Sequence, residues 1–311
     1  MNSTQLSYFT LSAYFDLGVF RYLCFLVVAC LYVVIVVSNV FLLVVICVNR
    51  SLHEPMYLFL CSLVVNELYG SSGLFPFLLL QILSDVHTVP AAFCFLQNFV
   101  LYGYGGVEYL TLAVMAYDRY VAICCPLRYG ARMTSGHVGV LVAAAWLGPV
   151  LLCIVMTALS KSLQLCGNVI QKVYCDNYSV TKLACSDTAA SNVYGLVVVS
   201  LSVFVPLVLI LYTYVKILQV CFSGSRQTRQ KAVSTCSPHL ASLINFSCGG
   251  FFEILQSRFD MSDAPDVLRV LLSLYWLTCQ PLVNPLLYGL NVSKIRLVCR
   301  SLLFAGGSIT R

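Results

Sequence analysis

Charged residues are scarce in this sequence, and their scarcity excludes most classes of soluble protein. Only 10% of the 311 residues are charged and 60% are hydrophobic, whereas about a quarter of an ordinary soluble domain is charged. Catalytic and metal-binding signatures are also missing, since the chain has neither HExxH nor GxSxG and its four histidines are scattered. The composition therefore predicts a membrane protein and gives no support to an enzyme.

Long apolar runs recur seven times, and polar, glycine-containing or charged segments separate them. Each run can cross about 30 Å of hydrocarbon as an α-helix. We place the spans at residues 21–48, 57–83, 93–124, 137–159, 191–220, 231–256 and 267–290. The sequence therefore predicts an all-α membrane protein whose single domain, 1–311, comprises an N-terminal segment (1–20), a seven-transmembrane helix bundle (21–290) and a tail (291–311).

Basic residues set the orientation, because short loops rich in lysine and arginine stay in the cytoplasm. One side of the bundle carries twelve of the eighteen: Arg50, Arg119, Arg128, Arg132, Lys216, Arg226, Arg229, Lys231, Lys294, Arg296, Arg300 and Arg311. We therefore expect an extracellular N-terminus and a cytoplasmic C-terminus. The net charge of +6 reflects this topology, so the expected partner is the lipid bilayer and not nucleic acid.

The N-terminal segment lacks a basic region and a small-residue cleavage site, so we expect the first span to act as its own insertion signal. Of the Asn-X-Ser/Thr sequons, those at Asn2 and Asn177 face the outside in this topology. We predict glycosylation at Asn2, because Asn177 lies between cysteines that we expect to be bridged.

Four cysteines face the oxidising outer compartment: Cys94 at the start of the third span, and Cys166, Cys175 and Cys185 in the loop after the fourth. An even number predicts two disulfides, and four cysteines allow three pairings. A bridge from the loop to the third span would hold the loop over the mouth of the bundle as a lid. Such bridges can equally serve stability alone.

Three glutamates fall within the predicted spans, where an ionised side chain is costly unless it has a partner or a function. Glu67 and Glu108 would meet at mid-depth if the second and third spans are neighbours. Two adjacent carboxylates bind a cation such as sodium or share a proton, and a protonated glutamate with polar neighbours is the alternative. Glu253 lies near the outer end of the sixth span, where it would either read a cationic group or pair with a loop.

Five segments, in order, resemble motifs of the odorant receptors, a branch of the rhodopsin-like G-protein-coupled receptors. They are LHEPMY (52–57), MAYDRYVAIC (115–124), KLACSDT (182–188), KAVSTCSPHL (231–240) and PLVNPLLYG (281–289). The segment NELYG (66–70), with Glu67 where many odorant receptors have aspartate, is more similar to the fish-type branch. The resemblance spans nearly the whole chain.

The resemblance implies roles for individual residues. It pairs Cys94 with Cys175 and Cys166 with Cys185, and it places Glu67 and Glu108 with Asn39 and Asn284 around a sodium site. It also implies a short amphipathic helix after the seventh span and a cytoplasmic switch for G-protein coupling, formed by Asp118, Arg119, Tyr120, Tyr214, His239, Asn284, Pro285 and Tyr288.

Two departures from the family pattern lie in the sixth span. Pro238 stands where a small residue is usual before the histidine. Ser247 stands where an aromatic ring is common, which leaves Phe246 or Phe251 to supply a bulky ring that moves on activation.

A small-ligand cavity is expected between the outer halves of spans three, five, six and seven. Its candidate lining residues are Asn98, Leu101, Tyr102, Gly105, Gly106, Tyr194, Val198, Val199, Ser202, Phe251, Ile254, Ser273, Leu274 and Leu277. The seventh span has no lysine for a retinal Schiff base, and Leu101 stands where an amine receptor would carry an acid. We therefore expect neutral or weakly polar ligands.

The resemblance implies an odorant receptor in the plasma membrane of olfactory cilia. It would couple a small-molecule odorant to a heterotrimeric G protein of the stimulatory type and raise cAMP, with no cofactor apart from a sodium ion in the core. A rhodopsin-like receptor for a lipid or peptide is the nearest alternative. An ion channel or transporter is the alternative from another class, although no internal repeat supports it.

Overall fold

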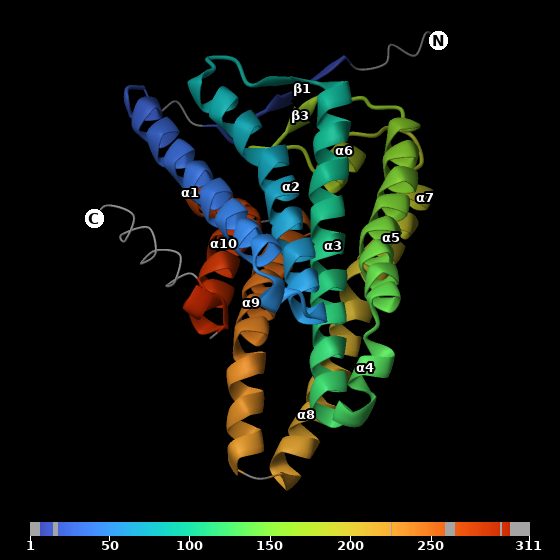
Figure 1. Cartoon of the computed structure of the whole chain (residues 1–311). Helices are drawn as coiled ribbons and strands as arrows, with labels where there is room; N and C mark the ends of the chain where they lie inside the picture. Colours follow the sequence, from blue (N-terminus) through green and yellow to red (C-terminus); the bar gives the residue numbers. More distant parts are fainter. Residues whose placement is uncertain (1–6, 15–17, 225, 259–264, 293, 299–311) are drawn as a thin grey trace, which may run out of the picture.

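Seven long helices follow the seven apolar runs, and each boundary lies within five residues of the expected position. The computed structural model describes residues 7–14, 18–224, 226–258, 265–292 and 294–298. The long helices in this part of the chain are α1 (Phe20–Val48), α2 (Pro55–Leu83), α3 (Ala91–Cys124), α5 (Ser135–Lys161), the pair α7 (Ala189–Val199) and α8 (Val205–Ser223), α9 (Arg226–Arg258) and α10 (Asp266–Asn291). They lie side by side as one bundle (Figure 1).

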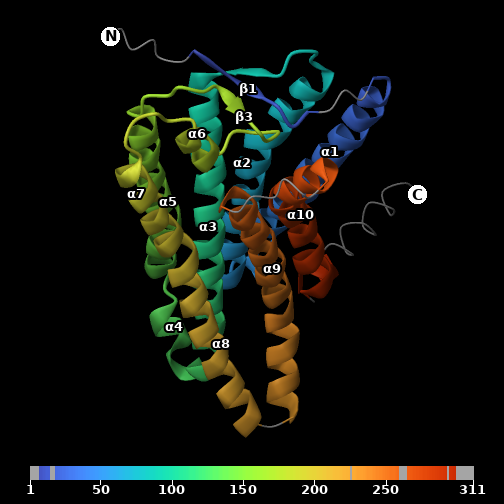
Figure 2. The same cartoon turned by 180° about the vertical axis from the view of Figure 1, so that it is seen from behind.

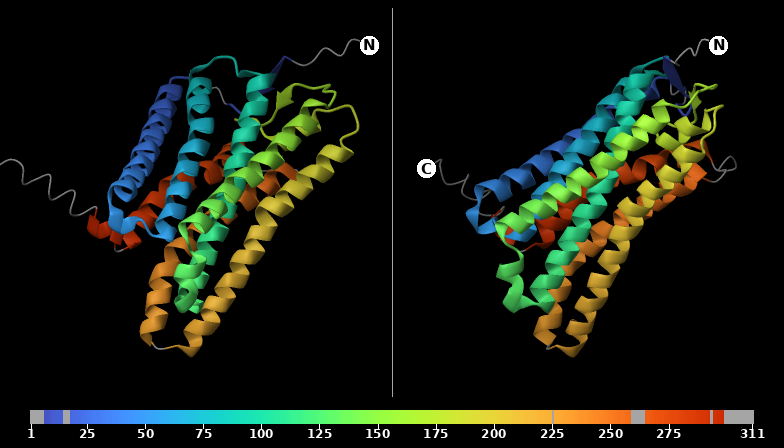
Figure 3. Two further views of the ribbon diagram at one scale, coloured as in Figure 1. Left: turned by 45° about the vertical axis from the view of Figure 1, so that its right-hand side comes forward. Right: turned by 90° about the vertical axis from the view of Figure 1, so that its right-hand side faces the viewer.

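The bundle is organised around α2 and α3, whose apolar stretches are the most buried of the spanning helices. Helix α3 contacts α2, α5, α8 and α9 (Figure 3). Among the described residues, six helical spans are long and apolar enough to cross a membrane. The remaining span is α9, which is long enough but begins with the basic segment of Arg226 and Arg229. The expected seven-span bundle is therefore confirmed.

Span five is not a uniform helix. Between α7 and α8 the backbone forms a π-helical turn over Ser200–Phe204, and Pro206 follows directly. A π turn inserts one extra residue into the helical register and often marks a functional site. Here it buries Ser202 against α3, where the Ser202 Oγ lies 3.6 Å from the position that a Cβ on Gly106 would take.

Short elements close the two ends of the bundle. One end carries the turns Arg50–Leu52 and Pro126–Arg128, helix α4 (Tyr129–Arg132) and the connection between α8 and α9. The other end carries helix α6 (Asn177–Lys182) and the strands (Figure 2). The expected helix after the seventh span is seen over residues 294–298, where Ile295 is fully buried.

A small sheet, which the sequence analysis did not foresee, covers the outer end. Strand β1 (Tyr8–Leu11) runs antiparallel to β2 (Thr88–Pro90) and parallel to β3 (Val169–Ile170). It buries Phe9 and Leu11 completely or nearly so. The N-terminal segment thus ties the α2–α3 loop to the loop after α5.

Helices α9 and α10 are in close contact at Gly249. A Cβ at this position would lie 2.7 Å from the Trp276 Cβ and 2.9 Å from the Trp276 Cα. Non-bonded carbon atoms do not approach to such distances. The two helices can therefore pack this closely only because residue 249 has no side chain.

Replacing Gly249 with alanine should therefore destabilise the folded protein. We expect a loss of about 1–3 kcal/mol from the forced separation of the helices, measured as a lower melting temperature in a fixed detergent. Gly139→Ala in α5 is the matched control, because a Cβ there meets no atom within 4 Å. Equal melting temperatures for the two variants would contradict the close contact.

Candidate functional site

A cavity of about 180 Å³ lies in the outer half of the bundle, bounded by α3, span five, α9, α10 and the loop after α5. Its floor is aromatic, because Tyr109, Phe246 and Trp276 come together there. Ser202 of the π turn contributes a hydroxyl to the wall. The cavity is thus an apolar chamber with few polar groups, which suits a small organic ligand.

Eight of the predicted lining residues face this cavity. They are Leu101, Tyr102, Gly105, Gly106, Val198, Val199, Ser202 and Ile254. Four of these residues, Leu101, Tyr102, Gly105 and Gly106, belong to α3, where helical spacing predicted which side faces the cavity.

The other six predicted residues lie elsewhere. Phe251 is 59% exposed on the outside of α9, Leu277 belongs to the main apolar core, and Leu274 packs against that core. Asn98 is buried outside the cavity lining, and Ser273 lines a second cavity nearer the surface. The Tyr194 hydroxyl donates to the Leu152 carbonyl at 3.2 Å.

Sequence reasoning missed the residues that the loop brings to the cavity. Tyr174, Asp176 and Tyr178 all line it, and each lies within three residues of Cys175. If this cysteine is bridged to the third span, its neighbours in the loop must also lie over the bundle, so the bridge was the available signal.

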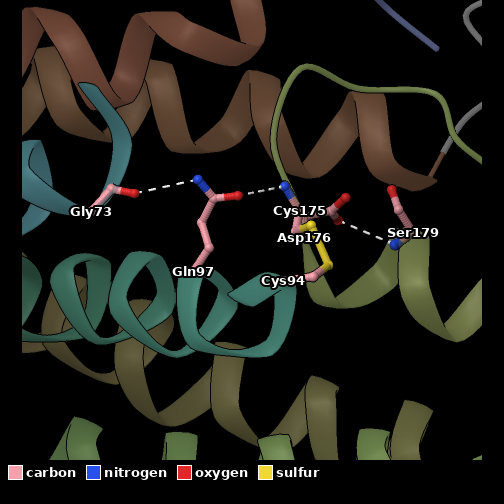
Figure 4. Close-up of a disulfide and its surroundings, with 6 residues drawn as sticks. All are labelled: Gly73, Cys94, Gln97, Cys175, Asp176 and Ser179. Atoms are coloured by element: carbon pink, nitrogen blue, oxygen red, sulfur yellow. Dashed lines mark hydrogen bonds between the residues drawn. A yellow bond between two sulfur atoms is a disulfide. The ribbon is translucent and has the colours of Figure 1, made fainter. Parts of the chain in front are cut away.

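The loop after α5 is a lid fixed by both expected disulfides, Cys94–Cys175 and Cys166–Cys185. Gln97, one turn along α3 from Cys94, reinforces the first bridge (Figure 4). Its Oε1 accepts from the Cys175 backbone N–H at 2.9 Å, and its Nε2 donates to the Gly73 carbonyl at 3.3 Å. The first bridge and these two hydrogen bonds tie the loop to α3 and α2.

Below the cavity, the expected meeting of Glu67 and Glu108 occurs. Asn284 Nδ2 lies 2.5 Å from Glu67 Oε1 and 3.3 Å from Glu108 Oε1, so one amide of α10 bridges carboxyl groups from α2 and α3. Both glutamates are fully buried. Two further amides, not foreseen from the sequence, donate to Glu108 at 3.0 Å: Asn66 and Gln280.

Hydrogen bonds around the two glutamates connect α2, α3 and α10 and reach α9 through Ser242. Gln280 Nε2 also donates to the Ser242 Oγ of α9 at 2.8 Å, and the Tyr104 hydroxyl donates to Glu67 at 3.0 Å. Asn39 is not hydrogen-bonded to either glutamate. It links α1 to α10 by donating to the carbonyl of Pro281, the residue after Gln280, at 2.8 Å. We call the set of Glu67, Glu108, Asn66, Gln280 and Asn284 the polar core.

The two aromatic rings considered in α9 differ in burial. Phe246 is 1% exposed and contacts the rings of Tyr104, Tyr109 and Trp276. Phe251 faces outward. Phe246 therefore lies directly between the cavity and the polar core, where a ligand can act on it.

At the inner end, Arg119 forms an ion pair with the neighbouring Asp118, whose Oδ1 accepts from the Tyr129 hydroxyl at 2.8 Å. His239 of α9 joins two other helices: its Nδ1 is 2.6 Å from the Tyr214 hydroxyl, and its Nε2 is 2.9 Å from the Leu112 carbonyl. Pro285 and Tyr288 are buried in α10, and Tyr120 is half-buried. The predicted switch residues thus lie in the inner half of the bundle.

A seven-helix bundle with this lid, cavity and inner ion pair matches known proteins closely. Residues 28–305 match the family model described as "Olfactory receptor". Human olfactory receptor 10A3 is 35% identical over 268 residues, covering 86% of this chain and 84% of the relative. The chain belongs to the olfactory receptor family.

Further similarities extend over almost the full length of the receptor. Human olfactory receptor 2F1 is 32% identical over 315 residues, covering 99% of this chain and 97% of the relative. Squid rhodopsin shares the fold, with a TM-score of 0.75 at 15% identity over 94% of this chain and 88% of that one. The receptor is thus a multi-pass plasma-membrane protein of the G-protein-coupled class, and not an enzyme.

Two sequons, at Asn2 and Asn177, are expected to face outward. Asn2 lies outside the described residues. Asn177 begins helix α6 and is buried, and its Oδ1 accepts from the Ser160 hydroxyl at 2.5 Å. Because its side chain is packed against α5, a glycan at Asn177 would require α6 to be displaced.

Proposed function

We propose that the receptor binds a small odorant in the 180 Å³ cavity and activates a heterotrimeric G protein of the stimulatory, olfactory type, which raises cAMP. The observation that carries the proposal is the position of α9. Its outer half lines the cavity through Phe246, Gly250 and Ile254. Its inner half is joined to α3 through His239, so occupancy of the cavity and the inner contacts depend on the same helix.

An agonist shifts the receptor only by its differential affinity for two arrangements of α9. In the arrangement seen here, His239 joins α9 to α3 and α8, and Ser242 joins it to α10. A ligand that presses on Phe246 favours an arrangement in which these bonds are broken. The inner end of α9 then moves away from α3, and Arg119 becomes available to a helix of the G protein.

Replacing Arg119 with alanine should abolish odorant-evoked cAMP and leave delivery to the cell surface intact. In the resting receptor the Arg119 guanidinium is paired with Asp118. Without this guanidinium, the proposed contact with the G-protein helix loses its hydrogen-bond donor. Arg50→Ala, an exposed arginine on the same side of the membrane, is the control and should signal normally. Normal cAMP responses from the Arg119 variant would contradict the assignment.

We also propose that the polar core binds a sodium ion between Glu67 and Glu108. The donor set fits this ion, because Na⁺ is bound by oxygen and several buried oxygens here accept no hydrogen bond from a described residue. They include Asn66 Oδ1, Asn284 Oδ1 and Thr111 Oγ1. A sodium ion at this point would balance one of the two carboxylate charges, the other glutamate being protonated for a neutral site, and would hold α2, α3 and α10 in their resting positions.

If sodium binds there, replacing extracellular sodium with a bulky organic cation should raise basal cAMP. Glu108→Gln should remove this dependence, because the amide neutralises the site but keeps its shape. Glu54→Gln, at an exposed glutamate paired with Lys294, should retain it. Basal signalling independent of sodium in the unmodified receptor would favour a proton shared by the two carboxyl groups.

A further inference from the structure

A lysine of the lid is buried between two carboxylates at the outer end of the cavity. Lys172 pairs with Glu253 of α9, and its Nζ lies 3.5 Å from the Asp176 Oδ1. It also donates to the Ser257 hydroxyl at 3.0 Å. Burial disfavours the charged form, but the carboxylates of Asp176 and Glu253 outweigh it and raise the pKa of Lys172. The Lys172 side chain is therefore charged at neutral pH.

The two carboxylates are not fully satisfied by this lysine. Glu253 Oε2 is buried and accepts no hydrogen bond from the described residues, and the same is true of Asp176 Oδ1, whose contact is the 3.5 Å ion pair. Asp176 as a whole is only 4% exposed. Two buried carboxylates share one ammonium, and an unpaired buried charge is costly. With two carboxylates and one ammonium, these three side chains carry a net charge of −1, which favours the binding of one more cation.

The positions of the three side chains show where that cation would lie. Asp176 and Glu253 line the 180 Å³ cavity, whereas Lys172 lines a neighbouring cavity of about 660 Å³ that shares Tyr178, Ser257 and Arg258 with it. The lysine thus pairs with the carboxylates without itself lining the 180 Å³ cavity. Arg258, the other cation on this wall, has its guanidinium carbon 4.2 Å from the centroid of the Tyr178 ring. Among the described residues, Asp176 and Glu253 both form their ion pairs with Lys172.

We propose that Asp176 and Glu253 form a binding site for the ammonium group of a small primary-amine ligand, with Lys172 as a built-in counter-ion that limits its affinity. This inference rests on the proposed odorant function and names the ligand class of the same cavity. The alkyl chain would lie in the apolar chamber below, against Phe246 and Val199. The ammonium would donate to the two carboxylate oxygens that have no hydrogen bond.

The inference revises the expectation of neutral ligands. That expectation rested on Leu101, which stands on α3 where an acid would anchor an amine. The structure supplies acids from two other elements, Asp176 from the lid and Glu253 from α9. Charge-assisted hydrogen bonds are roughly twice as strong as neutral ones, so an amine gains more at this site than an alcohol of equal length. A carboxylate ligand would be repelled.

Binding of n-hexylamine and of 1-hexanol to the purified receptor, measured calorimetrically in lipid nanodiscs without a G protein, tests the site. We expect the amine to bind at least about tenfold more tightly than the alcohol, which corresponds to about 1.4 kcal/mol. Glu253→Gln and Asp176→Asn should remove that preference. The asparagine still caps α6, where Asp176 Oδ2 accepts from the Ser179 N–H, so its effect reports charge.

Lys172→Met should strengthen amine binding about tenfold, because the carboxylates lose their internal cation. Lys182→Met is the matched control: this lysine belongs to the same loop but lies over the Tyr178 ring, with its Nζ 4.8 Å from the ring centroid. Equal binding of the two probes, or binding of neither, would overturn the proposal. Amine binding without any rise in cAMP would instead contradict the proposed function and leave the site standing.

Discussion

Two glutamates buried at mid-membrane are the constraint on which the rest of this structure depends. A carboxyl group has no water there, so its partners must come from the protein. Glu67 and Glu108 take theirs from Asn66, Gln280 and Asn284. These side chains belong to α2, α3 and α10. Their mutual hydrogen bonds therefore form together only when the three helices take one relative position. The polar core thus fixes the centre of the bundle.

Helix α9 connects the polar core to the cavity and to the lid. Gln280 extends the polar core to Ser242 of α9, and Phe246 lies one turn further out, between the core and the cavity. Helix α9 is therefore held to this centre by a few hydrogen bonds, and its outer half lines the cavity in which we propose that the ligand binds. The lid meets the same helix through Lys172 and Glu253. The cavity, the lid and the residues proposed to form the inner switch thus all contact one helix, α9.

Much of this could be predicted from the sequence, for identifiable reasons. Hydropathy located the spans because the bilayer fixes their length, and the cost of buried charge identified Glu67 and Glu108. Helical spacing predicted that Leu101 and Gly105 face a cavity from α3, and both line it. Phe251 is instead exposed on the outside of α9, because helical spacing alone does not give the rotation of a helix within the bundle. Pairing of Glu253 with a loop was one of two expectations and is observed, but the sequence could not name Lys172 as the partner, because an irregular loop has no periodicity from which its side-chain directions follow.

The central claim is that the polar core holds the helices together as a cooperative unit. A double-mutant cycle on Glu108 and Gln280, with leucine at each position and thermal unfolding in detergent as the readout, tests it most directly. Each single variant leaves a buried partner unsatisfied, so the double variant should be less destabilised than the sum, with a coupling of at least about 1 kcal/mol. Strictly additive effects would contradict the account.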